Sequence, residues 1–200
     1  MDDRFYIRPM TTDDVPRLAD MNPGFVSETA LHVERIGEGY QVGWRLVEVQ
    51  LPEPYDKGHG YDFNFSEQEN ILGRLRQPDA LEQVVIDSQT DQIVGVLDAA
   101  IEEWRRVLWI WNIMMDVSVR GRGIGRRLVE NSIAWAERYR LRAVMLETQT
   151  NNAPACRFYA RMGFQLVGIN QVFYTNHDIE RGEVALFWSY PIQYQSRREW

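Results

Sequence analysis

The sequence predicts a single mixed α/β domain, and three observations lead to that prediction. The chain has 200 residues, which is enough for one domain with a sizeable hydrophobic core. Strand-like patterns follow one another over residues 81–115. Helical periodicity then alternates with short apolar segments over residues 123–190. No internal repeat or linker divides the chain, so we expect residues 1–200 to fold as one domain.

The N-terminal part shows strand and helix patterns in turn. Strands are expected at residues 4–10 and 44–51, and helices at residues 11–21, 27–36 and 66–77. Thr11 or Thr12 is the expected N-cap of the first helix, because acidic residues occupy the turn that follows. Pro78 ends the third helix, and residues 52–60 are rich in Pro and Gly, which predicts a loop.

The C-terminal part is more regular. Residues 81–115 predict three strands in an antiparallel meander, with turns at Asp91 and at residues 102–106. A helix follows at residues 123–140. The remaining patterns predict a strand at 142–149, a short helix that ends at Gly163, and strands at 165–174 and 183–190.

Charge and composition limit the classes of partner. Residues 1–70 carry 14 Asp and Glu against 6 Lys and Arg, whereas residues 71–200 carry 15 against 16. A nucleic-acid binder needs a basic face, so we expect no nucleic acid partner. The acidic part favours a cationic small molecule or peptide. No apolar run is long enough to span a membrane, no signal peptide is evident, and Cys156 is the single cysteine, so we expect a cytoplasmic protein without a membrane partner.

A glycine-rich junction separates a predicted strand from a predicted helix. Gly121, Gly123 and Gly125 alternate there with other residues, within "RGRGIG". The N–H groups of a helix's first turn lack internal partners, and glycine lets a ligand approach the backbone closely. Such a junction binds phosphate well. Four arginines add charged donors nearby: Arg120, Arg122, Arg126 and Arg127.

The junction could in principle hold a phosphate in other known ways. A P-loop needs a lysine, which is absent here. A dinucleotide fingerprint needs its third glycine one residue later than Gly125, and it belongs to a parallel βαβ unit, whereas the strand before these glycines closes an antiparallel meander. A glycine-rich turn with surface arginines stays open. A phosphate-bearing cofactor is the leading hypothesis.

Two motifs resemble those of the GCN5-related N-acetyltransferase (GNAT) superfamily. The pattern [Q/R]-x-x-G-x-[G/A] is matched by Arg120, Gly123 and Gly125. The pattern N-x-x-A-x-x-x-Y-x-x-x-G-F is matched by Asn152, Ala155, Tyr159, Gly163 and Phe164. Within that superfamily the chain is most similar to the streptothricin acetyltransferases, densely over about residues 106–190 and more thinly over 44–105.

The resemblance implies a fold and an activity. The fold would be a central, mostly antiparallel sheet of about seven strands flanked by helices and splayed between the fourth and fifth core strands. Its core would be about residues 80–190, with residues 1–79 on the acceptor side. The activity would be transfer of acetyl from acetyl-CoA to a primary amine of a cationic small molecule, best a streptothricin-type antibiotic. Acetylation of a protein N-terminus or lysine, or a non-catalytic acyl-CoA-sensing regulator, are alternatives. A metal is not expected, and a homodimer is left open.

The resemblance also implies roles for individual residues. Backbone groups of Ile113, Met114 and Met115 would pair with the pantetheine arm, and Asn152 would contact the cofactor as well as capping a helix. Tyr159 would protonate the departing thiolate. Residues 121–126 would cradle the pyrophosphate through backbone N–H groups. The cofactor-binding residues of the junction would be Arg120, Gly121, Arg122, Gly123, Ile124, Gly125 and Arg126.

The general base is less defined. A lysine-like amine has a pKa of about 10.4, so it must lose a proton before it attacks. Glu147 is the chosen base, because it precedes Asn152 by five residues, where some N-terminal acetyltransferases of the superfamily have a catalytic glutamate. Asp98 and Glu102 are the other candidates. Two acids usually found in the strand before the junction of streptothricin acetyltransferases are replaced here by Trp111 and Asn112.

Overall fold

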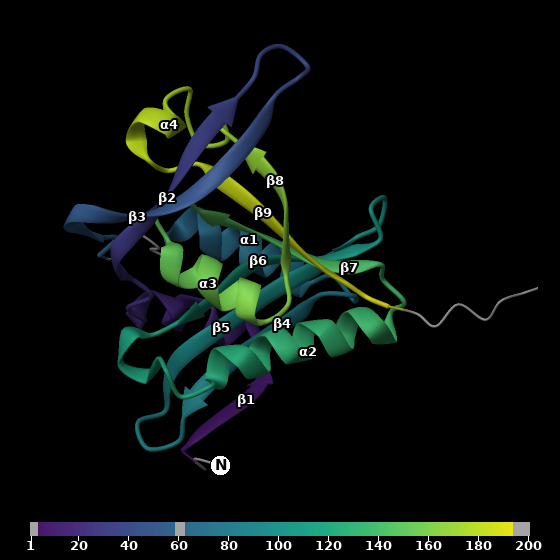
Figure 1. Ribbon diagram of the computed structural model, residues 1–200. Coiled ribbons are helices and arrows are strands. Elements are labelled where there is room, and N and C mark those ends of the chain that lie inside the picture. Colours follow the sequence, from purple (N-terminus) through teal and green to yellow (C-terminus); the bar gives the residue numbers. More distant parts are fainter. Residues whose placement is uncertain (1–3, 59–62, 194–200) are drawn as a thin grey trace, which may run out of the picture. The chain divides into compact units, whose positions relative to one another are not determined.

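The computed structural model, drawn in Figure 1, describes residues 4–58 and 63–193. The chain divides into two compact units. Within the described ranges, the first unit comprises residues 4–23, 63–146 and 189–193, and the second comprises residues 24–58 and 147–188. Seven strands are hydrogen-bonded in the order β1-β4-β5-β6-β7-β9-β8, and β2 and β3 form a separate two-stranded sheet. This confirms the predicted mixed architecture with a mostly antiparallel sheet. No helix within the described ranges is long and apolar enough to cross a membrane.

The strands of the first unit form the predicted meander. They are β1 (Phe5–Pro9), β4 (Leu81–Asp87), β5 (Gln92–Glu102) and β6 (Val107–Met115), with the antiparallel pairs β1–β4, β4–β5 and β5–β6. The turns between β4, β5 and β6 use positive φ at Asp91 (55°) and Arg106 (52°). The meander and both turn positions are therefore confirmed.

Strand β6 also pairs in parallel with β7 (Ala143–Gln149), but over a short length. The register runs from Val107 opposite Ala143 to Ile110 opposite Leu146, and β6 continues to Met115 beyond it. A bulge interrupts β6 at the same place, because Asp98 faces Asn112 while the next residue, Ala99, faces Ile110. The expected splay beside β6 thus begins at the residue that the bulge leaves unpaired, Trp111.

Two helices cover opposite faces of the meander. Along β4, Glu82 and Gln83 must point to opposite faces. Gln83 accepts a hydrogen bond from the Asn131 amide of α2 (Ile124–Arg138) at 2.8 Å, so α2 lies on one face. The other face packs on α1 (Phe65–Leu75) and buries an apolar cluster of Met10, Val15, Leu18, Met21, Phe63, Ile71, Val84, Ile86, Ile93 and Val96.

The expected helix at residues 11–21 is replaced by two short 3-10 segments. They are η1 (Thr12–Asp14) and η2 (Pro16–Asp20), and the missing N–H of Pro16 breaks the helix between them. Thr11 is the N-cap, as predicted, and its N–H donates to Asp14 at 2.8 Å. Arg8 adds two bonds of 2.6 and 2.7 Å to the buried Asp14 carboxylate, and these lower its pKa to about 2.

The second unit contains a long hairpin where a helix was expected. Residues 27–36 belong to strand β2 (Val26–Ile36), paired antiparallel with β3 (Gly43–Asp56), so the predicted helix is wrong. Cross-strand contacts outweigh the weak helical period, as in the 2.8 Å bond from Arg45 to Glu34. Strand β3 also takes in residues 52–56 of the expected loop, whereas residues 59 and 60 of that loop lie outside the described ranges.

The second unit also holds α3, most of β9 and the loop after β8. Its remaining elements are α3 (Ala153–Arg161), β8 (Gln165–Asn170), α4 (Asp178–Arg181) and the first part of β9 (Ala185–Pro191). Helix α3 packs on β2 and β8. The sequence predicted α3 and β9, but β8 ends four residues early and α4 was not expected. The segment between β8 and α4 is therefore a loop, and it carries Tyr174.

Candidate functional site

The glycine junction has the backbone that the sequence predicts. Gly121 has φ of 76° and Gly123 has φ of 79°, both in the left-handed region that favours glycine. A Cβ built on either residue meets no heavy atom within 4 Å among the described residues. These glycines are therefore required by their backbone conformation, and the space beside them is open to a ligand. Gly125 is not among the glycines with positive φ.

Helix α2 begins directly after the junction and suits an anion. Gly123 is its N-cap and supplies no side-chain hydrogen bond, so the first-turn N–H groups are not capped by a side chain. The helix dipole adds partial positive charge at this end. Ile124 is buried and anchors the first turn in the core. The geometry is that of a phosphate-binding helix N-terminus.

The arginines of the junction differ in what they contact. Arg120 donates to the Met115 carbonyl at 3.0 Å and to the Pro23 carbonyl at 2.8 Å, so it braces the junction rather than reaching outward. Arg126 forms an exposed ion pair with Glu130 at 2.8 Å. The Arg122 guanidinium lies 5.6 Å from the ring centroid of a nearby phenylalanine, Phe5.

Asp116 is a residue of the junction that the sequence analysis missed. Its carboxylate accepts from the N–H of Asn22 at 2.8 Å and from the N–H of Ser118 at 2.9 Å, and it caps η3 (Val117–Val119). Burial acts to raise the pKa of Asp116, but the hydrogen bonds outweigh burial and lower it. The Asp-x-Ser spacing is a recognisable capping pattern and could have identified it.

Strand β6 ends just before this junction with Ile113, Met114 and Met115, whose backbone groups are the candidates for pairing with the pantetheine arm. Met115 pairs with Gly95 of β5, and Met114 packs on the cluster beneath α1. The Met115 side chain fills the space over Gly95, where an added Cβ would lie 2.7 Å from the Met115 sulfur. Gly95 is thus needed so that Met115 can lie against the sheet. The pantetheine-pairing role of Ile113, Met114 and Met115 stays a prediction.

In the second unit, Glu147 is bonded to Tyr174. The Tyr174 hydroxyl donates to the Glu147 carboxylate. Burial raises the pKa of Glu147, and the bond from Tyr174 partly offsets this. The buried Asp178 accepts from the N–H groups of Tyr174 (2.9 Å) and Thr175 (2.7 Å), which fixes the loop that carries Tyr174. A carboxylate with a raised pKa suits a general base near neutral pH.

Helix α3 positions the other residues of the second motif. Asn152 caps α3 by accepting from the Ala155 N–H at 3.1 Å, so its capping role is confirmed. Tyr159 is 6% exposed, and its ring packs edge-on against Phe158 and Phe164. The cofactor contact of Asn152 and the acid role of Tyr159 stay predictions.

The surroundings of the single thiol and of the two alternative bases disfavour a catalytic role for these groups. Cys156 is buried against Thr148, and burial raises its pKa to about 11. Asp98 has no exposed surface and is bound twice by Arg74 at 2.6 Å. Glu102 is ion-paired with a neighbouring arginine. Over the described ranges, no group of three or more His, Cys, Asp or Glu could hold a metal.

Comparison with known proteins places this geometry in context. A family model described as the acetyltransferase (GNAT) family matches residues 44–164. The streptothricin acetyltransferase of Escherichia coli is 26% identical over 176 residues, which is 88% of this chain and 90% of that protein. The crystal structure of nourseothricin acetyltransferase superposes with a TM-score of 0.78 at 26% identity, covering 95% of this chain and 99% of that chain. A Bacillus anthracis structure solved in complex with acetyl coenzyme A has a TM-score of 0.72 at 23% identity, over 94% of this chain and 98% of that one.

Proposed function

The chain belongs to the acetyltransferase (GNAT) family and is an acetyl-CoA-dependent N-acetyltransferase, and on that premise we propose that its acceptor is a primary amine on a cationic antibiotic of the streptothricin class. Two relatives named for streptothricin or nourseothricin support this acceptor, each over about nine-tenths or more of both chains. The net charge of −7 also favours a cationic acceptor. The expected compartment is the cytoplasm.

One observation carries the donor side of the proposal. The junction combines two glycines of positive φ, open space over each, and a helix that starts without a side-chain cap. These features fit a diphosphate held by backbone N–H groups. When bound there, acetyl-CoA supplies an activated thioester. The groups proposed to hold its phosphates are the backbone N–H groups of the junction, from Arg120 to Arg126, because the Arg120 side chain braces the junction itself.

In the proposed reaction, Glu147 removes a proton from the acceptor amine and Tyr159 supplies one to the leaving thiolate. Glu147 takes a proton from the ammonium, because only the neutral amine has a lone pair with which to attack. Tyr174 holds the Glu147 carboxylate in one orientation by donating a hydrogen bond from its hydroxyl group. Tyr159 returns a proton to the sulfur of the departing thiolate, a transfer that a phenol of pKa about 10 can make. The Met115 N–H is the proposed donor to the developing oxyanion.

A CoA-release assay against a panel of amines tests the proposal. We expect turnover with streptothricin and little with neutral amines of similar size, and we expect Tyr159→Phe to lower kcat about 100-fold or more, as for the loss of a general acid. Turnover of peptide N-termini but not of streptothricin would shift the acceptor to protein. CoA binding without turnover of any amine would favour the non-catalytic alternative.

A further inference from the structure

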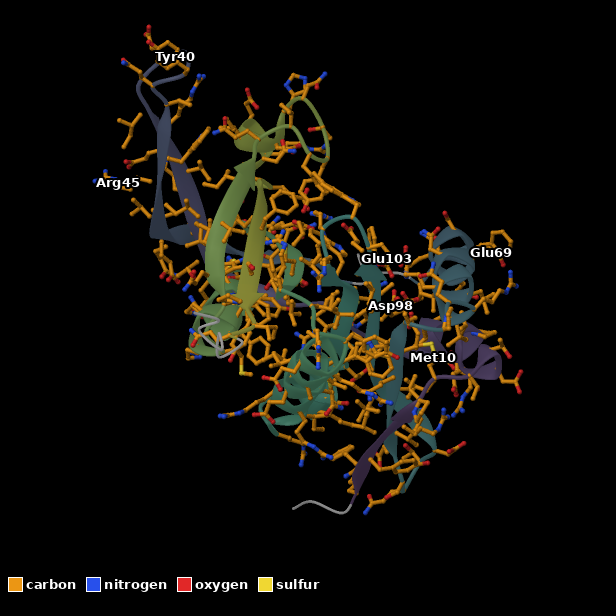
Figure 2. All side chains as sticks on the ribbon, turned by 90° about the vertical axis from the view of Figure 1, so that its right-hand side faces the viewer. Met10, Tyr40, Arg45, Glu69, Asp98 and Glu103 are labelled. Atoms are coloured by element: carbon orange, nitrogen blue, oxygen red, sulfur yellow. The ribbon has the colours of Figure 1, made fainter. Side chains whose placement is uncertain are left out.

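Three polar side chains form a row across the sheet of the first unit. Glu82 of β4 faces Asp98 of β5, and Asp98 faces Asn112 of β6. All three are buried, and Asp98 has no exposed surface. They lie on the face that α1 covers, where Figure 2 shows Asp98 between the sheet and that helix. Buried polar groups of this kind are costly unless they are paired, so the row needs partners from α1.

Helix α1 supplies two of those partners. Arg74 binds both carboxylate oxygens of Asp98 at 2.6 Å, and its Nη2 lies 3.1 Å from Glu67 Oε1. The Asn112 amide then donates to Asp98 and to Glu67, each at 2.7 Å. Glu67 thus brings a carboxylate from the helix to Asn112 of β6.

The charges in this network do not balance. Glu82 is 7% exposed and faces the Asp98 carboxylate across the sheet. Burial, reinforced by the charge of Asp98 and by a hydrogen bond with it, raises the pKa of Glu82, which favours its uncharged form. Arg74 and Asp98 neutralise each other as a bidentate pair. One negative charge therefore remains, on Glu67.

Glu67 is also the member of the network that reaches solvent. Its side chain is 32% exposed, against 13% for Arg74 and 0% for Asp98. Oε1 accepts from Asn112 and Arg74, while Oε2 accepts from the exposed Asn70 at 3.2 Å. A carboxylate has about four acceptor sites, so the outer oxygen can accept one more donor.

An exposed aromatic ring lies beside this carboxylate. Trp111 is the residue at the bulge of β6, and it is 51% exposed. The Arg74 guanidinium lies over the indole ring, 5.3 Å from its centroid, which places Trp111 next to the Glu67–Arg74 pair. The exposed part of the ring that Arg74 does not cover, together with the Glu67 carboxylate, suits an alkylammonium ion.

We propose that Glu67 and Trp111 form a recognition site for a protonated amine of the acceptor, with Asn112 and Arg74 holding the Glu67 carboxylate in place. This inference rests on the proposed function and names the residues that select a cationic acceptor. Glu67 binds the charge and does not take part in the chemical step. The site therefore affects acceptor KM, and neither kcat nor the KM of acetyl-CoA.

The test compares two charge-removing variants on one helix. Glu67→Gln keeps an oxygen that can accept from Asn112, whereas Glu69→Gln removes the same charge from an exposed position of α1, labelled in Figure 2. Steady-state kinetics with streptothricin should show acceptor KM raised about tenfold for Glu67→Gln and little changed for Glu69→Gln, with kcat of both close to that of the wild type. Raising the salt concentration should reduce the difference in acceptor KM between Glu67→Gln and Glu69→Gln.

Trp111→Leu tests the aromatic part of the proposed recognition site independently of Glu67. Its acceptor KM should rise severalfold, whereas Trp104→Leu, which removes another exposed indole, should have no effect. If wild-type enzyme turns over streptothricin but Glu67→Gln has an unchanged acceptor KM, this inference is overturned and the proposed function stands. If wild-type enzyme turns over no cationic amine, the proposed function fails and this inference fails with it. Thermal melting of each variant shows whether a raised KM reflects lost folding.

Discussion

Replacing Gly123 by valine should separate the binding role of the junction from its folding role. Gly123 has φ of 79°, and an L-residue in the left-handed region costs about 1–2 kcal/mol. Apart from its chain neighbours, no described heavy atom lies within 4 Å of the added Cβ, so the Cβ itself adds no clash to this cost. For a domain of this size, the loss corresponds to a fall in Tm of about 2–8 °C. The fold should therefore survive.

The effect on cofactor affinity should be larger than the effect on folding. The valine side chain would occupy the open space beside the first-turn N–H groups of α2, where the diphosphate is proposed to bind. Losing one hydrogen bond to a charged group costs about 1.5–3 kcal/mol, which corresponds to about 10- to 150-fold weaker binding. Isothermal titration of CoA into folded protein measures this directly.

Gly182→Val is the matched control for that experiment. Gly182 also has positive φ (64°), and no described heavy atom lies within 4 Å of an added Cβ. It should therefore lower Tm by a similar amount and leave CoA affinity unchanged. If Gly123→Val loses stability as Gly182→Val does but binds CoA as tightly as the wild type, the assignment of the junction is wrong.

Three further predictions concern pH and packing. Tyr174→Phe removes a hydrogen bond that lowers the pKa of Glu147, so the acidic limb of the pH profile of kcat should move to higher pH. Glu147→Gln should lower kcat most near neutral pH. A pH profile that neither variant changes would rule out Glu147 as the base. The pKa of Asp14 is lowered from 3.8 to about 2, so its ion pair stabilises the fold by about 2 kcal/mol above pH 3.8, and this contribution is lost as the pH falls towards 2. Urea titrations at pH 7 should show Asp14→Asn to be less stable than the wild type by about that amount. Equal stability of the two proteins at pH 7 would contradict this prediction. Gly95→Ala should push the Met115 side chain from the sheet and lower Tm, which a thermal melt would detect, and an unchanged Tm would mean that the thioether moves aside at no cost.

Local patterns predicted those parts of the fold that local physics decides. The meander was predictable because each strand has its own apolar pattern and the turns have identifiable residues such as Asp91. The left-handed backbone of Gly121 and Gly123 followed from glycine spacing between a strand and a helix. Strand β2 was missed because its pairing with β3 depends on contacts such as Glu34–Arg45, which no local period reveals.

The candidate site was less predictable, because its pairs join residues far apart in sequence. Glu147 was identified by its spacing from Asn152, but its partner Tyr174 lies 27 residues later, on a loop that Asp178 fixes. Glu67 lies 45 residues before Asn112 and was one acid among many in an acidic segment. Such pairings come from tertiary packing, which a single sequence does not encode locally.

The surroundings of Cys156 have a practical consequence for every kinetic experiment above. It is the chain's only thiol, it is 4% exposed, and its pKa is about 11. At pH 8 about one molecule in a thousand would carry the thiolate, and that thiolate would be shielded from reagents. Disulfide-exchange dyes added to the reaction would therefore report free CoA with almost no background from the enzyme. The same inertness allows a cysteine introduced on the surface to be labelled selectively.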